Sequence, residues 1–238
     1  LQGVPFQLDH EMRITYAGSF LGLFNPFALL AGVIGVAMLI MHGAVRLQSR
    51  SEGVIHARAQ KAVKFSAIVF IAAFVLAGVW IASGIEGYKI ISMPAPNSVM
   101  TPLDKMVEKA TGAWLNNYSA YPWTQLAPAL AIAAALIAVV LSHLQRTIFS
   151  FIFSSLSVAC VILTAGFAMF PFIIPSSSMP NVSLTAWDAT SSRRTLSIMF
   201  WLAMFFLPLI IAYTSWVYSV LRGKITVQTI RDSEHTSY

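Results

Sequence analysis

The chain has 238 residues, of which 57% are hydrophobic and only 10% are charged, and its mean hydropathy is +0.73. Because soluble domains carry about 25% charged residues, this composition excludes an ordinary soluble domain and indicates an all-α polytopic membrane protein. A membrane β-barrel is excluded too, because its strands alternate apolar and polar residues, whereas continuous apolar runs dominate here. The single cysteine, Cys160, cannot build a disulfide framework or a cysteine metal site within one chain.

Five apolar segments predict five transmembrane helices, at about residues 27–45, 65–85, 126–141, 148–170 and 196–220. Asn25 and Pro26 supply a cap and a first helical residue for the first span. The third span is rich in alanine, which suits burial in a bundle. Small residues four apart allow close helix contact, and they occur as Ala31 with Gly35 and as Ala73 with Ala77. We therefore expect a four-helix bundle from the first four spans.

The long connection between the second and third spans carries its own pattern. Apolar residues recur there at steps of three and four, at Leu103, Met106, Val107, Ala110 and Trp114. This spacing predicts an amphipathic helix that lies flat on the outer surface. Trp114 and the aromatic residues that follow it are expected at the depth of the lipid headgroups, namely Tyr118, Tyr121 and Trp123.

Residues 147–187 contain no charged side chain, and this run ends in the sequence Trp187-Asp188. Two interpretations of this pair stay open. In a structural one, Asp188 stabilises the start of the last helix or pairs with Arg193 or Arg194. In a functional one, the loop docks against a partner subunit with Trp187 as its anchor, since tryptophan is enriched among the residues that dominate interfaces.

The last span differs from the other four because it carries bulky aromatic side chains. Trp201 and Phe205 suit lipid or a partner subunit better than the centre of a bundle. We therefore predict that Trp187, Asp188, Trp201 and Phe205 are structural or subunit-interface residues, and we predict no catalytic, cofactor-binding or metal-binding residue.

Lysine and arginine predict the orientation of the chain. Basic residues gather in alternate connections, where few acidic residues oppose them: Arg46, Arg50, Arg58, Lys61, Lys64, Arg146, Arg222, Lys224 and Arg231. That side is expected to be cytoplasmic, with residue 1 outside and the C-terminus inside. This orientation explains the net charge of +6 without a nucleic-acid partner.

Motifs of catalysis or metal binding are missing from the sequence. His42 is placed to face the interior of the bundle, which makes it the one candidate haem ligand, but a lone histidine near a helix end is more often an interfacial polar residue. No carboxylate lies in the middle of a span, which disfavours an ion-coupled carrier.

Several ordered segments resemble subunit II of the cytochrome bd quinol oxidases. They include residues 1–6, 23–35, 77–80 with 84–88, 112–115, 153–156, 159–172 and 175–177, and the run Ala186-Trp187-Asp188-Ala189-Thr190-Ser191-Ser192. The resemblance covers essentially the whole chain. Cyanide-insensitive quinol oxidases share this subunit type.

The resemblance implies a nine-helix subunit, of which this chain would be the C-terminal portion, a second four-helix bundle plus a peripheral helix. It implies a supporting subunit of a terminal oxidase in the bacterial inner membrane, which couples quinol oxidation to reduction of oxygen to water and generates a proton-motive force. Haems b and d would belong to subunit I, the partner in a heterodimer, and some relatives hold a quinone or a small extra subunit. The alternative hypothesis is a membrane carrier or channel bundle of another class, with Pro208 marking a broken helix.

Overall fold

A computed structural model describes residues 1–94 and 101–220 of the chain. Within these two ranges, five helices are long and apolar enough to cross a membrane. They are α1 (Pro26–Arg50), α2 (Gly53–Ser83), α4 (Leu126–His143), α5 (Thr147–Met169) and α6 (Arg193–Val220). Each of the five predicted spans thus corresponds to one of these helices, although α2 begins at Gly53 rather than near residue 65. Its polar first turns extend the helix beyond the apolar run that predicted it.

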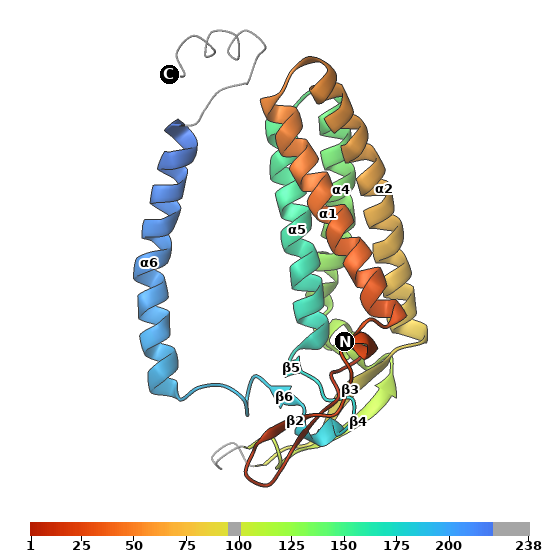
Figure 1. The fold of residues 1–238 in the computed structure, drawn as a ribbon, viewed down its shortest axis with the longest axis vertical. Helices are drawn as coiled ribbons and strands as arrows, with labels where there is room; N and C mark the ends of the chain where they lie inside the picture. The colour runs from red at the N-terminus through yellow and green to blue at the C-terminus, as the bar shows by residue number, and fades with distance from the viewer. Residues whose placement is uncertain (95–100, 221–238) are drawn as a thin grey trace.

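Helices α1, α2, α4 and α5 form one bundle, in which α1 packs on α2, α4 packs on α5, and the two pairs meet through α1 with α5 and α2 with α4 (Figure 1). The predicted cap is present, because Asn25 Oδ1 accepts a hydrogen bond from the Ala28 N–H at 2.7 Å. The side chains of Met41, Val45, Val63 and Phe70 fill the core. The expected four-helix bundle therefore forms from the first four spans.

Helix α4 lies in this bundle with its alanines inward, as its composition predicted. Ala131, Ala135 and Ala138 are fully buried, and serines of α5 face them. Ser150 Oγ donates to the Ala138 carbonyl and Ser157 Oγ to the Ala131 carbonyl, both at 2.7 Å. Small side chains on α4 let the two backbones approach closely enough for these interhelical hydrogen bonds.

The small-residue prediction is half right. Ala73 and Ala77 are buried against neighbouring helices, whereas Ala31 is exposed. A Cβ atom built on Gly35 would meet no heavy atom within 4 Å outside its own turn. Spacing alone marks two positions on one helix face, but it does not say whether that face meets a helix or lipid.

Helix α6 stands apart from the bundle (Figure 1), and none of its described side chains is buried. It returns to the bundle near its C-terminal end, where the Tyr218 ring centroid lies 5.8 Å from the Arg46 guanidinium carbon. The same guanidinium lies 5.2 Å from the Phe151 ring centroid. The bundle and the peripheral helix are therefore connected by the chain at one end and by this cation–π pair at the other.

In the part of the chain that the structure describes, three two-stranded antiparallel sheets gather at one end of the bundle, which we call the hairpin end (Figure 1). They pair β1 (Phe6–Leu8) with β2 (Ile14–Tyr16), β3 (Glu86–Ser92) with β4 (Met106–Thr111), and β5 (Phe172–Ile174) with β6 (Leu184–Thr185). Short helical segments complete this end: η1 (Leu21–Leu23), η2 (Ala113–Leu115), α3 (Asn116–Ala120), η3 (Pro122–Gln125) and η4 (Pro180–Val182). The opposite end, which carries the basic connections, is called the basic end below.

The predicted amphipathic surface helix is wrong. Its central residues form β4, which pairs with β3 so that Tyr88 lies opposite Lys109. Burial alternates along this segment, with Lys105 and Val107 inward and Met106 and Glu108 outward. The alternation typical of a strand could not be recognised from the sequence, because a lysine occupies one of the buried positions and lysine is almost never fully buried unless it is paired.

Trp114 is not an exposed interfacial anchor, because its side chain is buried inside the protein. Its side chain is 1% exposed and packs edge-on against Phe172 at a ring-centroid distance of 5.8 Å. Tyr118 is buried as well, and its hydroxyl donates to the Thr164 carbonyl at 2.6 Å. Tyr121 and Trp123 are exposed, as expected for interfacial residues.

We expect Ser157→Ala to destabilise the bundle by about 1 kcal/mol, because the substitution removes a buried hydrogen bond between helices α5 and α4. The midpoint of denaturant unfolding measures this effect. Ser155→Ala is the matched control, since the Ser155 hydroxyl bonds to the Phe151 carbonyl within its own helix. Equal effects of the two substitutions would contradict the interhelical role of Ser157.

Candidate subunit-docking site

The Asp188 carboxylate is buried at the hairpin end, in the connection between α5 and α6. Its Oδ2 atom lies 2.6 Å from Lys105 Nζ, and the two side chains are 2% and 1% exposed. Oδ1 accepts a hydrogen bond from the Thr185 N–H at 2.8 Å. Lys105 Nζ also donates to the Pro102 carbonyl at 3.0 Å. The partner of Asp188 is therefore Lys105, and the expected pairing with Arg193 or Arg194 is wrong.

The strand β4 holds the same connection at two further places. The Val107 N–H donates to Asn181 Oδ1 at 2.7 Å, and Lys109 Nζ donates to the Ser177 carbonyl at 2.9 Å. Lys105 directly precedes β4, so the three contacts follow one another along residues 105–109. This stretch of the β3–β4 hairpin thus fixes the segment that leads into α6.

The N-terminal segment adds a third layer to this junction. The Val4 N–H donates to the Pro175 carbonyl at 2.9 Å, and the hydroxyls of Ser176 and Ser178 both donate to the Phe6 carbonyl. We define the junction as residues 175–188 with their contacts to β4 and to residues 4–6. Its backbone is anchored on several sides, so the point where the chain leaves for α6 is well fixed.

Trp187 lies beside Asp188 but is 48% exposed. Its ring stands edge-on to Phe170 at a centroid distance of 5.8 Å. The structure thus separates the two residues of the sequence signature. Asp188 holds the junction from inside, whereas Trp187 is presented on the surface, partly supported by Phe170.

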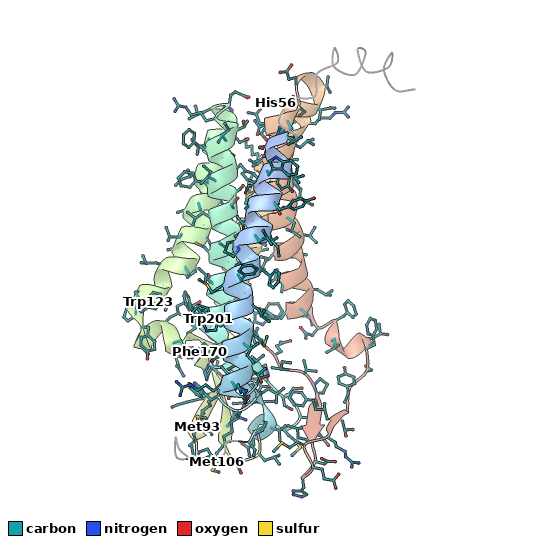
Figure 2. All side chains as sticks on the ribbon, turned by 90° about the vertical axis from the view of Figure 1, so that its left-hand side faces the viewer. His56, Met93, Met106, Trp123, Phe170 and Trp201 are labelled. Carbon is teal, nitrogen blue, oxygen red and sulfur yellow. The ribbon has the colours of Figure 1, made fainter. Side chains whose placement is uncertain are left out.

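Helix α6 presents the other two predicted residues outward. Trp201 and Phe205 are 70% and 69% exposed, and because they are four residues apart they share one face of the helix. Figure 2 looks onto α6 and shows Trp201 in its half nearer the hairpin end. Trp187 precedes this helix, so the chain carries exposed aromatic side chains from the junction into the span.

His42 is engaged inside the bundle. Its Nδ1 lies 2.9 Å from Ser154 Oγ, and its ring stacks on Phe151 at a centroid distance of 4.8 Å. One ring nitrogen and one ring face are thus occupied by α5, so His42 helps to pack α1 against α5. Among residues 1–94 and 101–220, no three His, Cys, Asp or Glu side chains gather to hold a metal ion.

A polar network at the basic end was not predicted. Gln48 is buried, its Nε2 donates to the Ser142 carbonyl at 3.0 Å, and its Oε1 accepts from the Ser142 hydroxyl at 2.6 Å. His56 bonds to the Gln48 carbonyl through Nδ1 and to Gln145 Oε1 through Nε2, at 3.0 and 2.6 Å. The network ties the α1–α2 connection to the α4–α5 connection. Only the burial of Gln48 reveals it, since scattered polar residues at helix ends carry no pattern.

An aromatic platform under the bundle supports the hairpin end. Tyr88 packs on Trp114 and Phe172, and its hydroxyl donates to the Gln2 carbonyl at 3.3 Å. Burial, with a smaller contribution from Glu86, raises the pKa of Tyr88 to about 12. Burial also raises the pKa of Tyr118. Both phenols therefore remain neutral hydrogen-bond donors at physiological pH.

Comparison with known proteins decides the family. The family model described as cytochrome bd terminal oxidase subunit II matches residues 1–221. The chain belongs to this family. It is 44% identical over all 238 residues to the cytochrome bd-I ubiquinol oxidase subunit 2 of Escherichia coli (strain K12), and 43% identical to a probable cytochrome oxidase subunit 2 of Haemophilus influenzae. It covers 63% of the length of each of these relatives, which is less than two thirds.

Proposed function

We propose that this chain acts in a supporting, non-haem-ligating subunit of a bd-type terminal oxidase. The complex would oxidise quinol, reduce oxygen to water and contribute to the proton-motive force of an aerobic respiratory chain. The observation that carries the proposal is the family match over residues 1–221, because it includes the Trp187-Asp188 junction and the whole of α6. The Escherichia coli relative is a ubiquinol oxidase subunit by name, which supports quinol as the proposed substrate class.

Within that complex, the proposed partner of the chain is subunit I, which would carry haems b and d. Trp187, Trp201 and Phe205 are the contact residues that we propose, because they are large, apolar and exposed along one continuous stretch of chain. Asp188 is a positioning residue. Its buried contact with Lys105 fixes the junction from which Trp187 and α6 project.

No cofactor is assigned to the chain itself, and His42 is given a packing role between α1 and α5. A haem in subunit I would supply the electron transfer and oxygen chemistry. The described residues of this chain would provide packing, membrane anchoring and the interface. A quinone and a small extra subunit are also proposed for the complex, and we assign no residue of this chain to contact either of them.

The proposed location is the bacterial inner membrane, with the hairpin end outside and the basic end in the cytoplasm. The positive-inside rule supports this orientation, because Arg50, Arg58, Lys61, Lys64 and Arg146 all belong to the basic end. The chain would then enter from the outer side and reach the cytoplasm at the end of α6.

Haem absorption of the purified complex tests the proposal. The complete complex should show b and d haem absorption, and its His42→Ala variant should keep the same haem content per complex. Loss of haem in that variant, with the complex otherwise assembled, would overturn the proposed non-ligating role.

A further inference from the structure

A groove between α1 and α2 is lined by apolar side chains that the rest of the bundle leaves exposed. Its volume is about 710 Å³. Leu29, Val36 and Ile40 of α1 form one wall, Phe65 of α2 stands at its basic end, and Phe20 and Phe24 close its other end. These two phenylalanines pack edge-on at a ring-centroid distance of 5.5 Å.

The interior of the groove offers no polar contact. The Ser66 hydroxyl, which lies at the lining, donates to the Ala62 carbonyl at 2.6 Å and is therefore already satisfied. Gly32 also belongs to the lining, and a Cβ atom built on it would meet no heavy atom within 4 Å outside its own turn. Gly32 therefore leaves open space in the groove. Because the lining offers no free polar group, the groove favours a hydrocarbon ligand.

The length of the groove favours an acyl chain over a helix. The lining of α1 runs from Ala28 to Ile40, about 18 Å along the helix axis. One leaflet of a bilayer has a hydrocarbon depth of about 15 Å, half of the roughly 30 Å core. A membrane-spanning helix would need the whole 30 Å, and it would also need a wider face than one groove between two helices.

Positive charge at the basic end of α2 favours a lipid with an anionic headgroup. Arg58 and Lys61 lie seven and four residues before Phe65, so they continue its face of α2, and both are exposed. Glu52 is the only acidic residue in the sequence from 25 to 85. An anionic headgroup at this position would therefore meet an excess of positive charge at the mouth of the groove.

We propose that the groove binds an anionic phospholipid, with one acyl chain along Gly32 and the headgroup phosphate against Arg58 and Lys61. This site is independent of the proposed oxidase function, because neither the junction nor His42 contributes to it. Its effect would be to fix one lipid to the α1–α2 pair while leaving the contact residues of α6 free.

Native mass spectrometry of the complete, detergent-purified complex, titrated with phosphatidylglycerol, tests the site. Arg58→Gln with Lys61→Gln should weaken binding of the retained phosphatidylglycerol about thirtyfold, since each basic residue near a lipid surface contributes about fivefold. Gly32→Leu should abolish retention by filling the groove. The matched controls are Arg146→Gln, an exposed basic residue in the connection between α4 and α5, and Gly35→Leu, which lies outside the lining.

Retention that survives both the charge variant and Gly32→Leu would overturn the proposal, and so would an equal loss in the two controls. Cross-linking of a Val33→Cys variant to another polypeptide, in place of a bound phospholipid, would also overturn it. Haem content and oxidase activity are not the readout, so a failure here is distinct from a failure of the proposed function.

Discussion

Lys105→Met should loosen the junction by about 3–5 kcal/mol, because it leaves the Asp188 carboxylate buried without its cation. Hydrogen exchange of the backbone amides at residues 180–188 measures this loss directly. Exchange there should accelerate by about a hundredfold to a few thousandfold, since each 1.4 kcal/mol is a factor of ten. The Thr185 amide is the sharpest probe, because its N–H is bonded to Asp188 Oδ1.

The double variant Lys105→Met, Asp188→Asn separates charge from packing. Asparagine retains an oxygen that can accept from the Thr185 N–H, while the uncompensated charge is gone. We therefore expect the double variant to recover most of the lost protection. Lys89→Met is the control, because Lys89 is an exposed lysine on β3 and its replacement should change stability by less than about 0.5 kcal/mol. If the double variant exchanged its amides at residues 180–188 as fast as Lys105→Met does, the uncompensated buried charge would not be the cause of the loosening.

Trp201→Ala together with Phe205→Ala should weaken association with subunit I by about a thousandfold. Each large aromatic at the centre of an interface contributes about 2 kcal/mol or more, roughly thirtyfold, and the two share one face of α6. Co-purification of subunit I through a tag on this chain measures the effect. Membrane insertion of the variant should stay normal, because the span remains apolar.

The matched control for this experiment lies on the opposite face of the same helix. Met199 and Phe206 are also exposed, and at 100° per residue they lie roughly opposite Trp201 and Phe205. Met199→Ala with Phe206→Ala removes similar bulk and should leave co-purification nearly unchanged. Unaltered recovery of subunit I with the Trp201 and Phe205 variant, or an equal loss with the control, would refute the proposed contact face.

The membrane helices were predictable because a single physical requirement, the burial of apolar residues in hydrocarbon, fixes their length and character. The Asn25 cap and the alanines of α4 could also be identified locally, because helix capping and close helix packing each favour particular residue types. The start of α2 could not, since its first turns around Gly53 are polar and carry no apolar signal. Packing of the first four spans followed from composition, while the exposed position of Ala31 did not.

The hairpin end was harder to predict because its contacts connect residues far apart in the sequence. Lys105 and Asp188 are separated by 83 positions, and no local pattern pairs them. The apolar spacing around Val107 fitted a helix as well as a strand, and only the partner strand β3 decides between them. Trp187, Trp201 and Phe205 could be selected from the sequence by size and position, and their role at an interface stays a prediction.

The haem content of the assembled complex tests the central claim most directly. We predict that b and d haem absorption per complex is unchanged by His42→Ala, and that this chain purified alone shows no haem absorption. Haem retained by the isolated chain, or haem lost from an otherwise assembled His42→Ala complex, would contradict the account of a supporting subunit that ligates none.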